Sequence, residues 1–247
     1  MHRRSLLKAA AILPWPMGAS ADVDPQAGDL IDAIIRAHGG ATAWRGLQSL
    51  NAEGDIIAVM RGERGRYQRW MARDRKLRVE THYANSDETR ILNGSRSWRT
   101  TAGSMMLPVT GIGQLAMVYQ YKQLDLPYGL LQKLYTVRIL GHEPLDGVAC
   151  MVLQLSDSEG PTMRVHVDES NQRIVQVTGL ISVGAASTSL SARFADYQLV
   201  EGINLPMRIN NFSGNAPISE THIQRYALNP TTEPARFEPP AATGQSA

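Results

Sequence analysis

The sequence predicts a mainly β fold with short helices, that is, an α+β protein built on antiparallel strands. Apolar and polar residues alternate in segments such as "KLRVETHY" (76–83) and "TMRVHVD" (162–168), which is the pattern of a half-buried strand. In the second segment Met163, Val165 and Val167 point to one side and the residues between them to the other. The pattern predicts a sheet with one face in water and about ten to twelve strands in all.

Helical periodicity is expected in two places. The first helix begins near Asp24 and Pro25, which are typical of a helix start, and ends at Gly39. The second lies in an insertion between Met105 and Leu134, where the alternation disappears. The residues at helical spacing there are Ile112, Leu115, Ala116 and Tyr119.

The first 21 residues are predicted to form a cleavable export signal of the twin-arginine type. Arg3 and Arg4 precede an apolar run that is broken by prolines, and a membrane span would need about 20 consecutive apolar residues. The run ends in Ala-Ser-Ala, which suits cleavage after Ala21. An ordinary Sec signal is the alternative, because its first residues are also basic. Either route predicts a periplasmic protein.

The remaining chain is predicted to be one domain, residues 22–237, followed by a disordered tail, residues 238–247, that is rich in proline, alanine and polar residues. The net charge of +2 includes three basic residues of the signal, so the mature chain is close to neutral. A nucleic-acid partner, which needs a basic surplus, is not expected. Cys150 is the one cysteine, so no internal disulfide forms, and it does not sit at the cleavage site as a lipid-bearing cysteine would.

No enzyme or metal motif is found in the sequence. There is no HExxH and no GxSxG, and "GIGQLA" (111–116) lacks the βαβ context of a dinucleotide site. We therefore expect no cofactor, no metal and no catalytic residue, and His166 and His222 are expected on the solvent face of strands.

One basic cluster has two interpretations, a solvated sheet face or a contact for anionic head groups or a partner protein. Its members are Arg61, Arg64, Arg66, Arg69, Arg73, Arg75, Lys76 and Arg78.

Several segments, taken in order, resemble the LolA/LolB-like superfamily of periplasmic lipoprotein carriers, in its branch of outer-membrane lipoprotein-sorting-like proteins. "LIDAIIRAHGGATAWRGLQSLNAEGDI" (30–56) is similar to the opening helix, glycine stop and first strand, and "ILNGSRSWR" (91–99) to a hairpin followed by Trp. The later sheet and the closing strand are matched by "GHEPLDGVACMVLQL", "VHVDESNQRIVQV", "FADYQLVEGINLPMRI" and "IQRYALNPTTEPARFEPP". The resemblance covers nearly all of the mature chain.

This resemblance implies an incomplete antiparallel β-barrel, a strongly curved sheet with a helical lid over an apolar cavity. It further implies a non-enzymatic carrier or binding protein for a lipidated protein or another acyl or apolar ligand, in transient contact with the membrane or envelope proteins. An arginine of the carrier that contacts the lid corresponds to Arg73. The alternative is an RseB-like envelope sensor of the same fold that acts through a protein partner.

The predicted ligand-binding residues form two groups. Early strands supply Tyr67, Met71, Arg73, Val79 and Trp98, and the helical insertion supplies Ile112, Leu115 and Tyr119. If the insertion is a lid, the two groups meet across a cavity. The alternative is that they form a solid core, since an apolar helical stripe is usually packed away.

Overall fold

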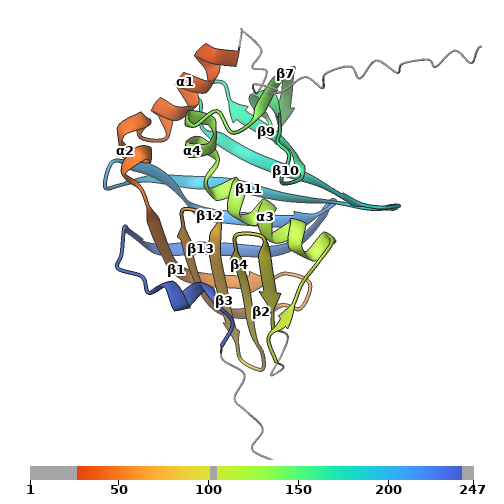
Figure 1. The fold of residues 1–247 in the computed structure, drawn as a ribbon. Helices are drawn as coiled ribbons and strands as arrows, with labels where there is room; N and C mark the ends of the chain where they lie inside the picture. Colours follow the sequence, from red (N-terminus) through yellow and green to blue (C-terminus); the bar gives the residue numbers. More distant parts are fainter. Residues whose placement is uncertain (1–26, 101–104, 241–247) are drawn as a thin grey trace, which may run out of the picture.

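The computed structural model describes residues 27–100 and 105–240. Within them all strands form one antiparallel sheet of 13 strands in the order β6-β5-β4-β3-β2-β1-β13-β12-β11-β10-β9-β8-β7. The sheet curls strongly but does not close, since β6 and β7 are its two edges (Figure 1). The predicted curved, incomplete barrel is confirmed. The predicted signal (1–21), the helix start at 24 and 25, and tail residues 241–247 lie outside the described residues.

The early half of the sheet consists of β1 (Ser49–Ala58), β2 (Glu63–Ala72), β3 (Lys76–Tyr83), β4 (Asp87–Asn93), β5 (Arg96–Arg99) and β6 (Leu107–Pro108). The later half consists of β7 (Thr136–Leu145), β8 (Val148–Ser156), β9 (Thr162–Asp168), β10 (Ile174–Val183), β11 (Ala186–Val200), β12 (Ile203–Ser213) and β13 (Ala216–Leu228). The pairing of β1 with β13 joins the two halves. Strands β3 and β9 coincide with the segments that alternate in the sequence.

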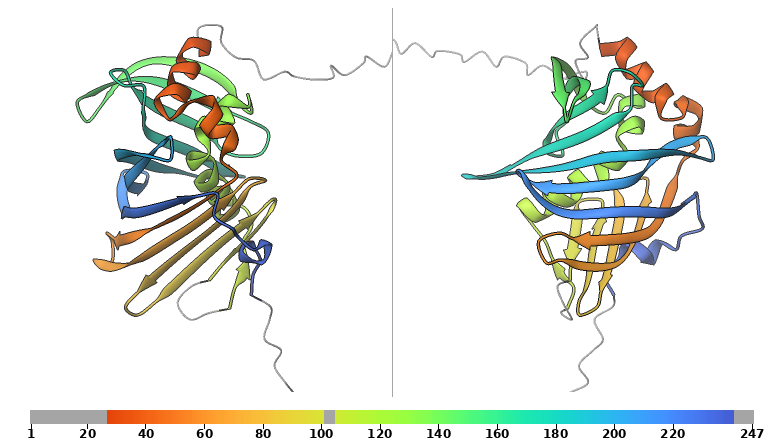
Figure 2. Two further views of the ribbon diagram at one scale, coloured as in Figure 1. Left: turned by 90° about the vertical axis from the view of Figure 1, so that its left-hand side faces the viewer. Right: turned by 180° about the vertical axis from the view of Figure 1, so that it is seen from behind.

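Two pairs of helices accompany the sheet. Helices α1 (Ala27–Ala37) and α2 (Gly40–Gly46) precede β1, whereas α3 (Ile112–Leu124) and α4 (Leu126–Leu131) form the predicted insertion between β6 and β7. Helix α3 crosses the hollow of the sheet, and it contacts β10 on one side and β3, β4 and β5 on the other (Figures 1 and 2). None of the helices in the described part of the chain is long and apolar enough to cross a bilayer.

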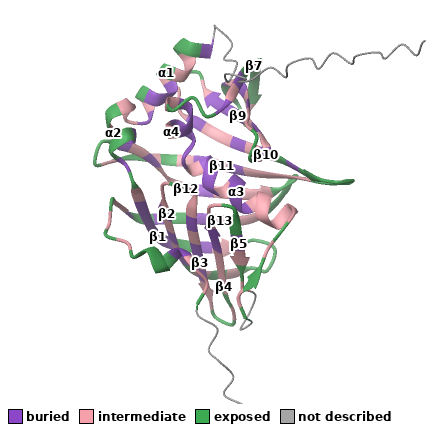
Figure 3. Ribbon diagram, viewed as in Figure 1, coloured by how far each residue is buried: buried purple, intermediate pink, exposed green. Residues whose placement is uncertain are grey.

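Two apolar clusters lie between the sheet and the helices. Figure 3 shows the buried residues of the strands and helices in purple. The later half of the sheet supplies aliphatic residues such as Leu153, Val165 and Val177, which pack against Tyr119 of α3. The early half supplies Leu77 and Leu92 among others, which pack together with Met117, Val118 and Tyr121 of the same helix. Helix α3 thus takes part in both clusters.

The helix pair α1 and α2 is docked on the turn between β11 and β12. Gly39 has a φ of +114°, and a Cβ there would lie 2.2 Å from the carbonyl oxygen of Gly202. The amide of Asn204 bonds to the neighbouring carbonyls, with its side chain 2.8 Å from the oxygen of Ala37. Glycine at position 39 therefore does more than stop the first helix, because it also allows this close approach.

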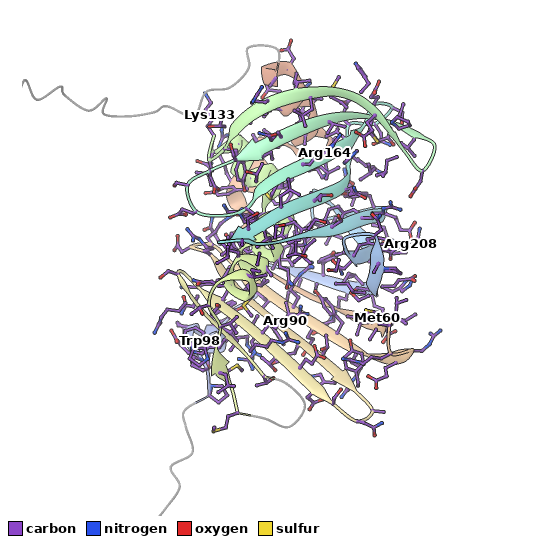
Figure 4. The ribbon with its side chains drawn as sticks, turned by 90° about the vertical axis from the view of Figure 1, so that its right-hand side faces the viewer. Met60, Arg90, Trp98, Lys133, Arg164 and Arg208 are labelled. Atoms are coloured by element: carbon purple, nitrogen blue, oxygen red, sulfur yellow. The ribbon has the colours of Figure 1, made fainter. Side chains whose placement is uncertain are left out.

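The convex face holds two residues for which the structure corrects a prediction. Trp98, predicted to line the cavity, pairs with Ile91 on the face opposite Leu92, so it lies on the convex side of the sheet. The 3₁₀ helix η1 (Pro234–Phe237) contacts the neighbouring strands β3 and β4. Trp98 is labelled in Figure 4. His166 is not solvated but 3% exposed, with Glu143 beside it, and burial lowers its pKa.

The C-terminal segment stays attached beyond the predicted domain boundary at residue 237. Glu238, the first residue of the predicted tail, accepts a 2.7 Å hydrogen bond from the Asn93 side chain and one of 3.1 Å from Arg96. These contacts hold the segment after η1 against the turn between β4 and β5.

Candidate ligand cavity under helix α3

Tyr119 fixes the middle of α3 to the later half of the sheet. Its ring lies over Gly179 of β10, where a Cβ would come within 2.5 Å of the ring. Its hydroxyl donates a 2.8 Å hydrogen bond to the carbonyl of Val177, and burial raises its pKa far above the ordinary value. The absence of a side chain at position 179 is what allows the helix to settle into the hollow.

The C-terminal end of α3 is held by Arg73 on the other side. Its guanidinium pairs with Asp125, which follows α3, and also donates to the carbonyls of Leu47 and Trp44 at 2.9 and 3.1 Å. It stacks on Tyr128 of α4 at 3.4 Å from the ring centroid. Arg73 therefore contacts the helices above the cavities and does not line either of the two cavities beneath α3.

A first, mostly apolar cavity of about 40 Å³ lies between the C-terminal end of α3 and the sheet. Its wall is mainly aliphatic and aromatic and includes Trp44, Leu47, Leu50, Met71, Leu124, Phe194, Leu205 and Tyr226. His38 and Arg69 are its titratable nitrogen side chains. A water molecule needs about 10 to 15 Å³ of cavity volume measured in this way, so this cavity has room for a few waters.

His38 is neutral in this wall. Its Nδ1 lies 2.8 Å from the carbonyl of Ile34 and its Nε2 lies 3.5 Å from the amide nitrogen of Ile174, which fits a tautomer with the proton on Nδ1. Burial lowers its pKa to about 4, with a further contribution from Arg173. The first cavity therefore contains one charged group at neutral pH, Arg69.

A second cavity of about 80 Å³ lies on the other side of Arg69, and its lining is polar as well as apolar. Tyr67, Val79 and Tyr119 supply part of the wall. The polar remainder comprises Arg69, Arg90, Gln120, Gln123, Ser191, Asn211, Ser219 and Thr221. Arg69, Gln123 and Leu124 belong to both cavities, so these three side chains form the partition between them.

The structure brings together half of the predicted site residues. Tyr67, Met71, Val79 and Tyr119 line one or other cavity. The other four, Arg73, Trp98, Ile112 and Leu115, do not line either cavity. Ile112 and Leu115 are half-buried at the N-terminal end of α3, because the buried part of the helix is its C-terminal end, which is buried almost all round.

Arg69 and Arg90 are the site residues that the predictions missed. Arg69 is 4% exposed, so the interpretation of the basic cluster as a solvated face is wrong for this member. A usable signal was present in the sequence: in "YQRWM" the residues Tyr67, Arg69 and Met71 alternate with period two, which places all three on one face.

The described residues contain no group of three His, Cys, Asp or Glu side chains that could hold a metal ion. Within the same residues Cys150 is buried and free. The groups that the cavities offer to a ligand are apolar side chains, hydroxyls, amides, the neutral imidazole of His38 and two guanidiniums.

No family model and no curated protein matches the sequence, but several solved structures match the fold. A DUF1329 family protein from Desulfovibrio piger has a TM-score of 0.55 at 12% identity, covering 85% of this chain and 96% of the other. An outer-membrane lipoprotein-sorting protein domain from Vibrio parahaemolyticus has a TM-score of 0.53 at 13% identity over 85% and 95%. A LolA superfamily protein from Nitrosomonas europaea has a TM-score of 0.53 at 16% identity over 83% and 94%.

These likenesses establish the class of fold. The chain has the LolA-like fold, an open, curved antiparallel sheet with helices across its concave face.

Proposed function

We propose that the protein is a periplasmic, non-enzymatic carrier or binding protein for a lipidated protein or another acyl ligand, held on the concave face beneath α3. The observation that carries the proposal is that two cavities remain between α3 and the sheet, on either side of Arg69, although the helix packs against both apolar clusters. The lining of the first cavity by Leu47, Leu50, Met71 and Phe194 supports an apolar ligand.

An acyl chain needs more room than the two cavities offer. Their volumes of about 40 and 80 Å³ hold only a few waters each, so binding requires α3 to move away from the sheet. The polar contacts that this movement breaks include those of Tyr119 with Val177, of Arg73 with Asp125, of Lys122 with Asp157 and of Gln114 with the carbonyl of Ser95. The movement also exposes Met117, Val118, Tyr119 and Tyr121, which are buried in the two apolar clusters, so the ligand has to replace these contacts.

The energetics suit a carrier that exchanges its ligand with a membrane. Burying a chain away from water gains about 0.8 kcal/mol per methylene, but a chain taken from a bilayer is already buried and gains almost nothing. An apolar cavity of approximate fit is then sufficient. The predicted export signal, with cleavage after Ala21, supports this proposal, since it would direct the protein to the compartment where such ligands cross the envelope.

The first test uses protein purified from the periplasm, followed by lipid extraction and mass spectrometry. We expect a lipid or acylated peptide in amounts close to one per protein. Protein without lipid that also fails to bind a fluorescent fatty acid contradicts the carrier function and favours the sensor.

A pair of variants tests the location of the ligand. Met71→Trp fills the first cavity and is expected to weaken binding of the fluorescent fatty acid about tenfold or more, since the indole occupies the ligand's space. Leu115→Trp is the matched control on α3, outside both cavities, and should bind as the unmodified protein does. Equal binding by both variants contradicts a ligand in the first cavity.

A further inference from the structure

We propose that Arg69 and Arg90 form a buried binding site for the acidic head group of the ligand, a carboxylate or a phosphate attached to an acyl or alkyl chain. This inference rests on the proposed function and names the class of ligand. It assigns the second cavity to the head group and the first cavity to the beginning of the chain.

Arg69 is a buried cation whose charge is not balanced by a carboxylate of the described chain. Its guanidinium makes one hydrogen bond, a long one of 3.4 Å from Nη1 to the Tyr67 hydroxyl, and lies 6.0 Å from the centroid of the Tyr67 ring. Its Nε has no hydrogen-bond partner. Burial disfavours the charged form, yet the phenol groups of Tyr67 and Tyr226 outweigh this effect and raise the pKa of Arg69. The guanidinium is therefore charged, and a buried unpaired charge is costly to keep.

Arg90 is a second arginine without a carboxylate partner in the described part of the chain, and it lies across the sheet from Arg69. In the register Arg69 lies opposite Val79 of β3, and Val79 lies opposite Arg90 of β4, so the two arginines are separated by one strand on the concave face. Adjacent strands are about 4.8 Å apart, which puts the two backbones about 10 Å apart. Side chains reaching inward from these positions can hold one oxyanion between them. Figure 4 labels Arg90 on the strands beneath α3.

The acidic residues near this site are already paired or lie elsewhere. Glu88, two residues before Arg90 on the same face, forms its ion pair with Arg61 at 3.0 Å. The lining of the second cavity contains two arginines and no Asp or Glu, and the lining of the first contains one arginine and no Asp or Glu. Nε of Arg90, like that of Arg69, lacks a hydrogen-bond partner among the described residues. The local charge is therefore positive and available to a ligand.

The arrangement of the two cavities gives the ligand a direction. Arg69 stands in the partition, so an anion beside it is in contact with the polar second cavity, where Asn211 and Gln123 offer amide groups. On the other side of the partition the wall becomes aliphatic and aromatic. When α3 moves, an acid bound at the arginines can extend its chain into that apolar region.

The test compares cis-parinaric acid with its methyl ester, which has the same chain and no charge. We expect the acid to bind at least about tenfold more tightly, as expected for hydrogen bonds to a charged group. Arg69→Gln and Arg90→Gln should each reduce this preference, with the affinity for the ester unchanged. Arg66→Gln is the control, because Arg66 is an exposed residue of β2 on the opposite face and its loss should leave the preference intact.

Arg69→Gln is expected to fold, since it removes a buried charge without breaking an ion pair, and its urea midpoint should equal or exceed that of the unmodified protein. If the urea midpoint of Arg69→Gln falls, the preference for the acid over the ester is tested with Arg90→Gln alone. Equal affinity for acid and ester in the unmodified protein overturns the head-group site and leaves the carrier function standing. Failure of both probes to bind contradicts the carrier function itself.

Two competitors distinguish a lipid head group from a free anion. Dodecyl phosphate should displace cis-parinaric acid at micromolar concentration, and inorganic phosphate should require at least about a hundredfold more, because it lacks the chain. Displacement by both at the same concentration overturns the assignment to a lipid.

Discussion

The two halves of the sheet use the same concave surface in different ways. Beneath α3 the later half is filled by aliphatic side chains such as Leu153, Leu155 and Val165, each fully buried. Among the described residues, its buried side-chain atoms without hydrogen-bond partners are on Arg164, His166, Arg208 and Asn210. These residues alternate along their strands with Val165 and Ile209 of the concave cluster, so they lie on the convex face, where Arg208 is also ion-paired with Asp196. Arg164 and Arg208 are labelled in Figure 4. The early half buries polar atoms without partners on the concave face itself, and both cavities reach it.

Both halves line the two cavities, but the difference shows that the early half bears the energetic cost of polar groups on the concave face. A buried polar group without a partner is costly, and an aliphatic residue at the same place would stabilise the fold. Arg69, Arg90 and Gln123 place this cost around the two cavities. Within the described residues the later half has no such groups on its concave face, where it anchors Tyr119 and supplies the other side of both cavities.

The largest expected effect is a loss of packing in the later half. Leu153→Ala removes a fully buried side chain of the first cluster and should lower the free energy of unfolding by about 2 to 5 kcal/mol. Met71→Ala, in the cavity wall, should cost less because space already lies beside it. Urea unfolding measures both. If both variants lower the free energy of unfolding equally, the two halves do not differ in how tightly they are packed.

An intermediate effect is expected on acidification, through His38. Its pKa is about 4 when buried and about 6.5 when the chain is unfolded. The unfolded state therefore binds the proton first as the pH falls, and stability present above pH 6.5 is lost between pH 6.5 and 4, by roughly 3 kcal/mol in full. His38→Gln should flatten this part of the pH dependence in urea unfolding.

His38 is informative because it links the halves. Its Nε2 faces the amide of Ile174 in the later half, and its carbonyl accepts a 2.9 Å hydrogen bond from Trp44, which belongs to the cluster of the early half. If His38→Gln keeps the full pH dependence, other groups such as His166, whose pKa is also lowered by burial, carry the acid sensitivity.

The smallest expected effect has the opposite sign. Gln123 has a buried Oε1 without a hydrogen-bond partner, so Gln123→Met, which is similar in shape, should raise the free energy of unfolding by about 1 kcal/mol. Gln176→Met is the matched control, because the Gln176 oxygen accepts a 2.8 Å hydrogen bond from Arg193, and it should lower stability by a similar amount. If both variants change the free energy of unfolding in the same direction, the unpaired Oε1 of Gln123 does not destabilise the fold.

The strands could be predicted because period two is a local property of the chain. The face that each residue occupies also follows from this period, but which face is concave does not, since curvature is set by the whole sheet. Trp98 illustrates the limit: its aromatic side chain fits a cavity or an outer surface equally well, and in the structure it lies on the convex side with the guanidinium of Arg96 over its ring.

The site was harder to predict because its helix has no apolar stripe. Met117, Val118, Tyr119 and Tyr121 of α3 are all buried, since the helix is surrounded by sheet on two sides, so spacing alone could not separate lining residues from the rest. Ile112 and Leu115 fit the helical period and yet lie at the less buried end. Arg69 was overlooked because seven other basic residues surround it in the sequence, and most of those are at least partly exposed.

The order of the strands bears on how the chain acquires its structure. Every neighbouring pair in the sheet joins consecutive strands, except for β1 with β13, where Leu50 meets Leu228. Hairpins form quickly because their contacts are local, whereas a contact between distant segments must first overcome the entropy of closing a long loop. The protein should therefore assemble as two meanders, and their union along one seam should be the late step that creates the hollow.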